Sequence, residues 1–175
     1  MPNPKSYVQT DHLSFFKFIG RVIGKALLEG CNLECYFVRS MYKMMIGQKL
    51  NFKDLEDYDN NLYTGLAWCL EPANDVEALY ECFSTQIDFF GRAEEIDLIP
   101  GGRDIDVTNE NKELYVERKA YFHLYKSVQK QVDAFLGGFY EIIPKELVSI
   151  FTYKELELLI SGLPDYQSKF FPYFY

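Results

Sequence analysis

The amino-acid sequence predicts an α+β fold that is predominantly helical, with a small helix-plus-β-hairpin subdomain inserted between helical segments. Apolar residues recur at helical spacing in several stretches, and capping residues, glycine or proline bound each stretch, which predicts the helices. An acidic, turn-rich stretch over residues 51–60 and the β-like residues that follow it indicate the inserted subdomain. A chain of 175 residues is long enough to bury a real core as one domain.

The first two predicted helices cover residues 12–29 and 36–46. Asp11 stands where it can cap the first helix, whose apolar residues form a wide stripe on one side. Gly20 and Gly24 lie on a common face of this helix, so another helix could come close there. The second helix carries three methionines, which we interpret as core filler rather than as a binding surface: Met41, Met44 and Met45.

The subdomain is predicted to open with a helix over residues 60–71, which Asp59 caps and Pro72 stops. Residues 77–84 then have a β-like pattern. We predict a small antiparallel hairpin from residues 96–98 and 105–107, because they flank a turn made of proline and two glycines.

Thr108 is predicted to cap the longest helix, over residues 109–136, and Gly137-Gly138 to end it. Pro144 is favoured at the first position of a further helix, because its missing N–H would have no intrahelical partner there. The last helix is predicted to start at a capping box of Thr152 and Glu155. Gly162 and Pro164 give its stop signal.

The composition excludes some classes of function. A net charge of −8 argues against a nucleic-acid surface, which needs clustered basic residues, and favours basic protein partners. No apolar run approaches the roughly 20 residues of a membrane span. The four cysteines have no paired spacing, so we expect buried free thiols in a reducing compartment, the cytoplasm and also the nucleus: Cys31, Cys35, Cys69 and Cys82.

The residues themselves predict no active site. Cys31 and Cys35 are too far apart in sequence for a zinc knuckle, and His12 and His123 have no second pair of ligands nearby. None of the cysteines has an adjacent histidine that would activate it. The sequence contains no phosphate-binding glycine motif. We therefore predict no metal, no cofactor and no catalytic residue in this chain.

Several long sequence segments resemble those of a known family. They are SYVQTDHLSFFKFIGRVIGKALLEG near the start, T-N-E-N at residues 108–111, AFLGGFYEIIPKELVSIF and KELELLISGLP. Together they resemble the N-terminal lobe of HECT-type ubiquitin-protein ligases, in particular the very large ligases of this family. The resemblance covers residues 6–164 and implies a partial N-lobe, in which a small subdomain of about residues 51–115 docks the ubiquitin-conjugating enzyme.

The resemblance also implies an activity. HECT ligases accept ubiquitin from a conjugating enzyme onto a cysteine in a separate C-terminal lobe and then pass it to a lysine of a protein substrate. The family's catalytic cysteine lies in a T-C-F-N word that does not occur here, and the aromatic tail over residues 165–175 departs from the family pattern. We expect the parent protein to be a transferase whose other regions choose the substrate, and this chain alone, without the second lobe, to be inactive.

The resemblance implies site residues as well. Carried over by position, the groove for the conjugating enzyme comprises Leu62, Leu66, Cys69, Tyr115 and Lys119, with Tyr63 as a rim contact. Phe90 matches a position that some HECT ligases use to hold a second ubiquitin, although Phe89 and Phe90 are equally compatible with a core role.

Two alternatives stay open at this stage. The apolar residues of the helix over residues 60–71 could simply bury that helix, which we favour for Leu70. The chain could also be a non-enzymatic interaction module that binds or sequesters partners without passing ubiquitin on.

Overall fold

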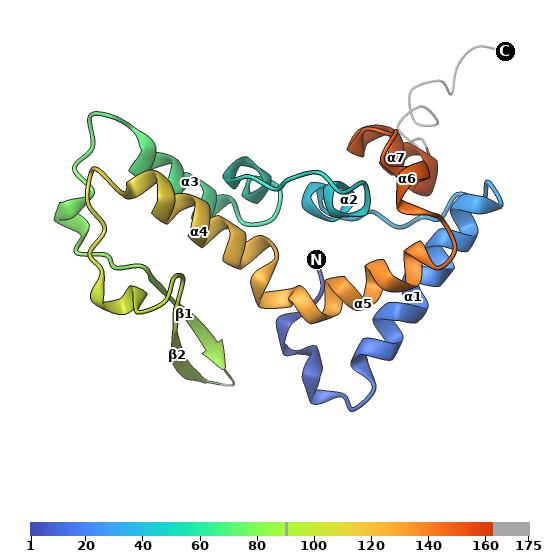
Figure 1. The fold of residues 1–175 in the computed structure, drawn as a ribbon, viewed down its shortest axis with the longest axis horizontal. Coiled ribbons are helices and arrows are strands. Elements are labelled where there is room, and N and C mark those ends of the chain that lie inside the picture. Colours follow the sequence, from blue (N-terminus) through green and yellow to red (C-terminus); the bar gives the residue numbers. More distant parts are fainter. Residues whose placement is uncertain (90, 163–175) are drawn as a thin grey trace, which may run out of the picture. The chain divides into compact units, whose positions relative to one another are not determined.

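The computed structural model describes residues 1–89 and 91–162, which are coloured along the chain in Figure 1. The chain divides into two compact units. The first unit comprises Met1–Thr10 and Lys49–Val132, and the second comprises Asp11–Gln48 and the described residues from Asp133 onward. The described residues are mainly helical, with one two-stranded antiparallel sheet, as the sequence predicts.

The second unit begins with α1 (His12–Leu28), which confirms the predicted helix to within one residue. Asp11 precedes it without a capping hydrogen bond from its side chain, so that predicted cap is wrong. Helix α2 (Arg39–Met45) starts three residues later than predicted because Val38 is extended, with ψ at 151°. The three methionines of this helix are buried, as predicted: Met41, Met44 and Met45.

Helix α5 (Gln129–Tyr140) runs through Gly137 and Gly138, so the predicted helix end at this pair is wrong. Within the second unit α5 packs tightly on α1. A Cβ atom at Gly138 would lie less than 3.0 Å from the carbonyl oxygen of Lys17, and one at Gly20 equally close to that of Phe135. The predicted close approach at Gly20 is therefore confirmed, and Gly138 is its counterpart on the partner helix.

The end of the second unit comprises α6 (Lys145–Val148) and α7 (Tyr153–Ser161). Pro144 occupies the N-cap position of α6 rather than its first helical position. The predicted capping box of α7 is confirmed: Thr152 N–H donates to the Glu155 carboxylate at 2.8 Å, and Glu155 N–H donates to Thr152 Oγ1 at 3.3 Å. Gly162 follows with φ at +75°, while Pro164 lies outside the described residues.

The first unit starts with the short 3₁₀ helix η1 (Pro4–Val8) and continues with η2 (Phe52–Leu55) in the acidic connector. Helix α3 (Asn60–Leu70) follows, and the Asp59 carboxylate accepts a hydrogen bond from Leu62 N–H at 3.0 Å. This confirms the predicted helix and its cap. After it, the predicted β-like stretch opens instead with the 3₁₀ helix η3 (Glu77–Leu79).

The hairpin lies at a different place from the predicted one. Strand β1 (Ser84–Phe89) pairs with β2 (Arg92–Asp97), in a register that joins Ser84 to Asp97 and Phe89 to Arg92. Gly91 in the connection has φ at +81°, a conformation that glycine adopts without a Cβ clash, and its N–H donates to Asp88 at 2.7 Å. The Pro-Gly-Gly turn leads instead into the 3₁₀ helix η4 (Gly102–Asp104).

The predicted long helix is two helices. Helix α4 (Lys112–Leu124) ends where Tyr125 leaves the helical region, with φ at −140° and ψ at −54°. The 3₁₀ helix η5 (Lys126–Val128) then leads into α5. The predicted cap is also wrong, because Asn111 is the N-cap residue of α4 and the Thr108 N–H donates to its side chain at 2.8 Å.

The four cysteines are free, but only Cys69 is buried; Cys31 is exposed, and Cys35 and Cys82 are half-buried. The prediction of buried thiols therefore holds for Cys69 alone. Among residues 1–89 and 91–162, no helix has the length and apolarity to cross a membrane. The same residues contain no group of three or more histidine, cysteine and acidic side chains that could hold a metal ion.

Candidate functional site

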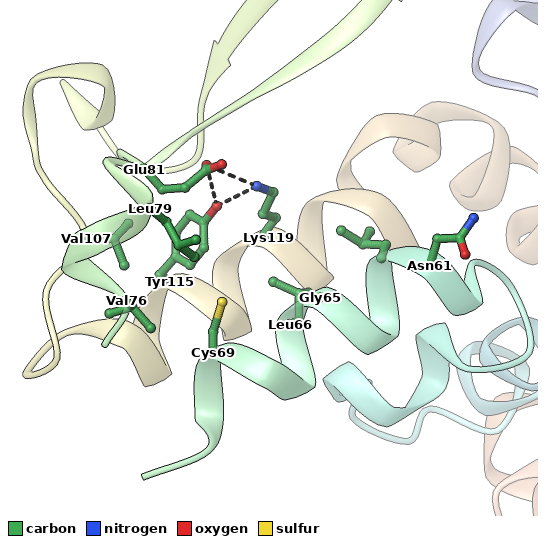
Figure 2. A pocket seen from close by; sticks show the side chains of 11 residues that line it. Asn61, Gly65, Leu66, Cys69, Val76, Leu79, Glu81, Val107, Tyr115 and Lys119 are labelled. Carbon is green, nitrogen blue, oxygen red and sulfur yellow. Dashed lines mark hydrogen bonds and ion pairs between the residues drawn. The ribbon is translucent and has the colours of Figure 1, made fainter. Parts of the chain in front are cut away.

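A pocket of about 210 Å³ lies within the first unit, between α3, α4 and the segment that contains η3 (Figure 2). Its lining is mostly apolar, with one acidic and one basic side chain. The residues that line it are Asn61, Leu62, Gly65, Leu66, Cys69, Val76, Leu79, Glu81, Val107, Tyr115 and Lys119.

Helix α3 forms one side of the pocket. Leu62, Leu66 and Cys69 recur at positions i, i+4 and i+7, so they share one face of the helix. Leu66 is only 3% exposed and packs in the core cluster of the unit together with Cys69. These two residues therefore form the floor of the pocket, and Leu62, which is partly buried, lies nearer its mouth.

Helix α4 contributes Tyr115 and Lys119 to the opposite side. Tyr115 is 2% exposed, and its ring packs edge-on against Phe83, with 5.5 Å between the ring centroids. Its hydroxyl donates to the Glu81 carboxylate at 2.9 Å and accepts a hydrogen bond from the Lys119 ammonium (Figure 2). Burial raises the pKa of Tyr115 far above its ordinary value, and the nearby charge of Glu81 raises it further. The hydroxyl therefore keeps its proton and remains a donor.

The third side of the pocket contains none of the residues predicted for the groove. It consists of Val76, Leu79, Glu81 and, from the returning segment, Val107. Leu79 is 46% exposed, whereas Val76 and Val107 are buried. The sequence predicted a β-like stretch at Leu79 and Glu81 and a hairpin strand at Val107, but no motif in these stretches indicated a binding role.

Five of the six residues predicted for the groove line this pocket, and Tyr63 does not. Its ring stacks on Phe52, with 5.8 Å between centroids and 15° between planes, and it packs against the core cluster. Tyr63 is adjacent in sequence to Leu62 but faces away, because neighbouring residues of a helix point in different directions. Phe90 lies outside the described residues.

The pocket has no activated nucleophile. Burial raises the pKa of the Cys69 thiol, and the positive charge of Lys119 only partly offsets this effect. A raised pKa keeps the sulfur protonated, and the protonated form is a weak nucleophile. The site is therefore suited to binding an apolar group rather than to covalent chemistry.

Comparison with known proteins adds the family. The family model of the HECT domain (ubiquitin-transferase) matches residues 1–171, which include the whole pocket. The chain belongs to the HECT-domain family. This confirms the resemblance found in the sequence.

Curated relatives agree with this assignment. The chain is 52% identical over 165 residues to the E3 ubiquitin-protein ligase TOM1-like of Neurospora crassa, and 50% identical over 164 residues to the E3 ubiquitin-protein ligase HUWE1 of Mus musculus. These alignments cover 94% and 93% of the chain but only 4% of each relative. A probable E3 ubiquitin-protein ligase hulA of Aspergillus niger is 48% identical over 93% of the chain and 20% of its own length. The HECT-family chain therefore spans a small part of the relatives it matches.

Proposed function

We propose that this chain belongs to a HECT-type ubiquitin-protein transferase and that its pocket recruits a ubiquitin-charged conjugating enzyme. The observation that carries the proposal is an apolar pocket, in a chain of the HECT family, lined by five of the six residues that the family resemblance indicates. We assign the docking role to the subdomain of about residues 51–115 together with Lys119 on the next turn of α4.

The size and character of the pocket favour a protein partner. Its volume of about 210 Å³ is below the roughly 300–1,000 Å³ of most small-molecule sites. An apolar pocket of this size suits one bulky side chain on a protruding loop, and such buried anchors usually dominate the energy of an interface. A docking role therefore fits the pocket better than binding of a metabolite.

We assign the transfer chemistry to another part of the parent protein. The T-C-F-N word is not present in this chain, and burial raises the pKa of both Cys35 and Cys69. Incubation with ubiquitin, its activating enzyme and a conjugating enzyme should give no reductant-sensitive thioester on this chain. A thioester mapped to any of its four cysteines would refute this part of the proposal.

The docking proposal is tested by titrating the 175-residue chain with a panel of ubiquitin-charged conjugating enzymes in a calorimeter. Leu79→Asp is the informative variant, because this leucine lines the pocket and is 46% exposed, so a polar residue there leaves the core intact. Leu147→Asp is the matched control, because Leu147 is 59% exposed on α6 in the second unit.

At least one enzyme should bind the unaltered chain. Leu79→Asp should weaken that binding at least about tenfold, as expected for an anchor-lining residue, while Leu147→Asp should leave it unchanged. Lack of binding across the panel, or equal losses in the two variants, would refute the docking role. If the docking holds but the longer parent protein transfers no ubiquitin, the chain is an interaction module instead.

A further inference from the structure

One end of the pocket is closed by a network of three polar side chains from two separate segments. The Glu81 carboxylate accepts a hydrogen bond from the Tyr115 hydroxyl at 2.9 Å, and the same carboxylate oxygen lies 3.5 Å from the Lys119 ammonium nitrogen. The ammonium also donates to the Tyr115 hydroxyl and lies 4.9 Å from the centroid of the Tyr115 ring. Glu81 is therefore tied to α4 by a charge-assisted hydrogen bond and an ion pair.

The network is sheltered on the α4 side. Tyr115 is 2% exposed, and the Lys119 side chain is 17% exposed, against 47% for Glu81. An ion pair gains strength when water is partly excluded from it, and a buried hydroxyl is costly when it loses its partner. Loss of the Glu81 carboxylate would leave the Tyr115 hydroxyl without its acceptor and the Lys119 ammonium without its ion-pair partner.

The segment that Glu81 anchors is also held on both sides of Leu79 and Tyr80. Before them, the Asn109 side chain accepts Val76 N–H at 3.3 Å and donates to Asp75 at 3.0 Å; after them, Cys82 forms a β-bridge with Asp106. In η3, Leu79 N–H donates to the Val76 carbonyl at 3.1 Å, and Tyr80 N–H donates to the Glu77 carbonyl at 3.2 Å. The Glu81 carbonyl accepts Val107 N–H at 2.8 Å. This segment carries Leu79, the exposed apolar residue of the pocket.

The backbone next to Glu81 is also strained. Tyr80 has φ at +52° and ψ at +35°, and it is the one residue other than glycine with positive φ in the described chain. Its side chain is almost fully exposed, so its own packing does not hold this conformation. A left-handed residue persists only where its surroundings impose it, and the adjacent anchor at Glu81 is such a restraint.

We propose that Glu81 is a positioning residue of the docking pocket: by binding Tyr115 and Lys119 it fixes the wall that carries Leu79 and so preforms the pocket for its partner. Tyr115 and Lys119 hold Glu81 in place from α4. This inference rests on the proposed docking function. Preorganisation matters for affinity because a wall that is already ordered costs less conformational entropy on binding.

Glu81→Ala and Tyr115→Phe test the proposal together. Tyr115→Phe keeps the aromatic ring and removes only the hydroxyl, so it separates the network from any contact that the ring makes. Asp97→Ala is the control for Glu81, because the Asp97 carboxylate also accepts a hydrogen bond from a basic side chain, that of Arg103 at 2.9 Å, elsewhere in the same unit. Tyr140→Phe is the control for Tyr115, because the Tyr140 hydroxyl donates to main-chain carbonyls in the second unit.

Two measurements are made on each variant of the 175-residue chain. The first is the dissociation constant for the conjugating enzyme that the unaltered chain binds. The second is amide hydrogen exchange of the free chain at three reporters of the wall: the N–H groups of Leu79, Tyr80 and Val107. Exchange in the free chain needs no partner, so it tests the positioning role independently of the docking function.

Glu81→Ala and Tyr115→Phe should each weaken binding about tenfold, the size expected for a hydrogen bond to a charged group. Both should also speed exchange at the three reporters about tenfold or more, and neither control should do so. The double variant should lose no more than the stronger single variant, because both changes break the same contact. Unchanged affinity and exchange in Tyr115→Phe would overturn the proposal. Faster exchange without binding to the unaltered chain would refute the docking function and leave the positioning role standing.

Discussion

Gly138 and Gly137 on α5 offer a matched pair of substitutions with opposite expected effects. A Cβ atom at Gly138 would lie less than 3.0 Å from the carbonyl oxygen of Lys17 on α1, a separation that real Cβ atoms essentially never show. Because the obstacle is backbone, it cannot rotate aside as a side chain would. At Gly137 no atom beyond its chain neighbours and the backbone of its own helix lies within 4 Å of the same position.

The magnitudes follow from two competing terms. Replacing glycine by alanine inside a helix favours the folded state by about 0.8–1.0 kcal/mol, because alanine loses less backbone entropy on folding. Forcing an extra carbon into a packed contact costs about 1–3 kcal/mol. Gly137→Ala should therefore raise the free energy of unfolding by up to about 1 kcal/mol, and Gly138→Ala should lower it by up to about 2 kcal/mol.

The measurement is urea unfolding followed by the circular dichroism of the helices. Both variants change the same residue type in the same helix, so differences in helix propensity cancel between them. We expect Gly138→Ala to be at least about 1 kcal/mol less stable than Gly137→Ala. Equal stability of the two would show that α1 and α5 do not pack as closely as the structure places them.

Three further predictions concern the second unit and the cysteines. Lys17 and Arg21 of α1 hold the pKa of Glu141 below its ordinary value of 4.5. The stability from this contact is therefore present above pH 4.5 and is lost as the pH falls through the lowered pKa, and Glu141→Gln should remove this part of the acid dependence in unfolding experiments. Exposed Cys31 should react with iodoacetamide in the native chain, whereas buried Cys69 should react only after unfolding, as mass spectrometry of timed samples would show. Thr152→Ala should cost about 0.5–2 kcal/mol of stability, because it removes the side-chain acceptor of the α7 capping box, and Thr152→Ser should restore most of it.

Local signals explain which helices the sequence could predict. The cap at Asp59 and the capping box at Thr152 each join a residue to a backbone group only three positions away, so the sequence alone contains both partners. The end of α4 at Tyr125 has no such signal, because neither proline nor glycine stands there and the apolar spacing continues. The glycine pair of α5 gave a misleading signal, since Gly138 is required by the close approach of the Lys17 backbone, which lies far away in the sequence.

The hairpin was misplaced for a related reason. Strand β2 is rich in charged residues and largely exposed, so it lacks the apolar alternation that marks a strand. The Pro-Gly-Gly turn looked like a hairpin connection but leads into η4. Pairing between β1 and β2 instead depends on the connection at Gly91 and on the Asp88 side chain that accepts its N–H.

The pocket is formed partly by residues that local sequence signals predict and partly by residues that only contacts between distant segments bring together. Its helical sides were predictable, because Leu62 and Leu66 follow helical spacing and the family resemblance points to the same residues. Its third side, with Leu79 and Glu81, depends on hydrogen bonds to a helix more than 30 residues later in the chain, which no local pattern encodes. Sequence reasoning therefore identified the floor of the site and missed its wall.

The burial of Tyr115 limits its role in the pocket. As a residue of the predicted groove, Tyr115 would contact a partner through its ring, yet it is 2% exposed and its ring packs against Phe83 inside the unit. A ring so enclosed adds little contact area to an interface, whereas its hydroxyl still reaches Glu81. Among the apolar side chains that line the pocket, Leu79 is the most exposed. Affinity should therefore depend strongly on the position of the η3 segment, and Tyr115→Phe, which removes only a hydroxyl from a buried side chain, should change it without altering the apolar surface at Leu79.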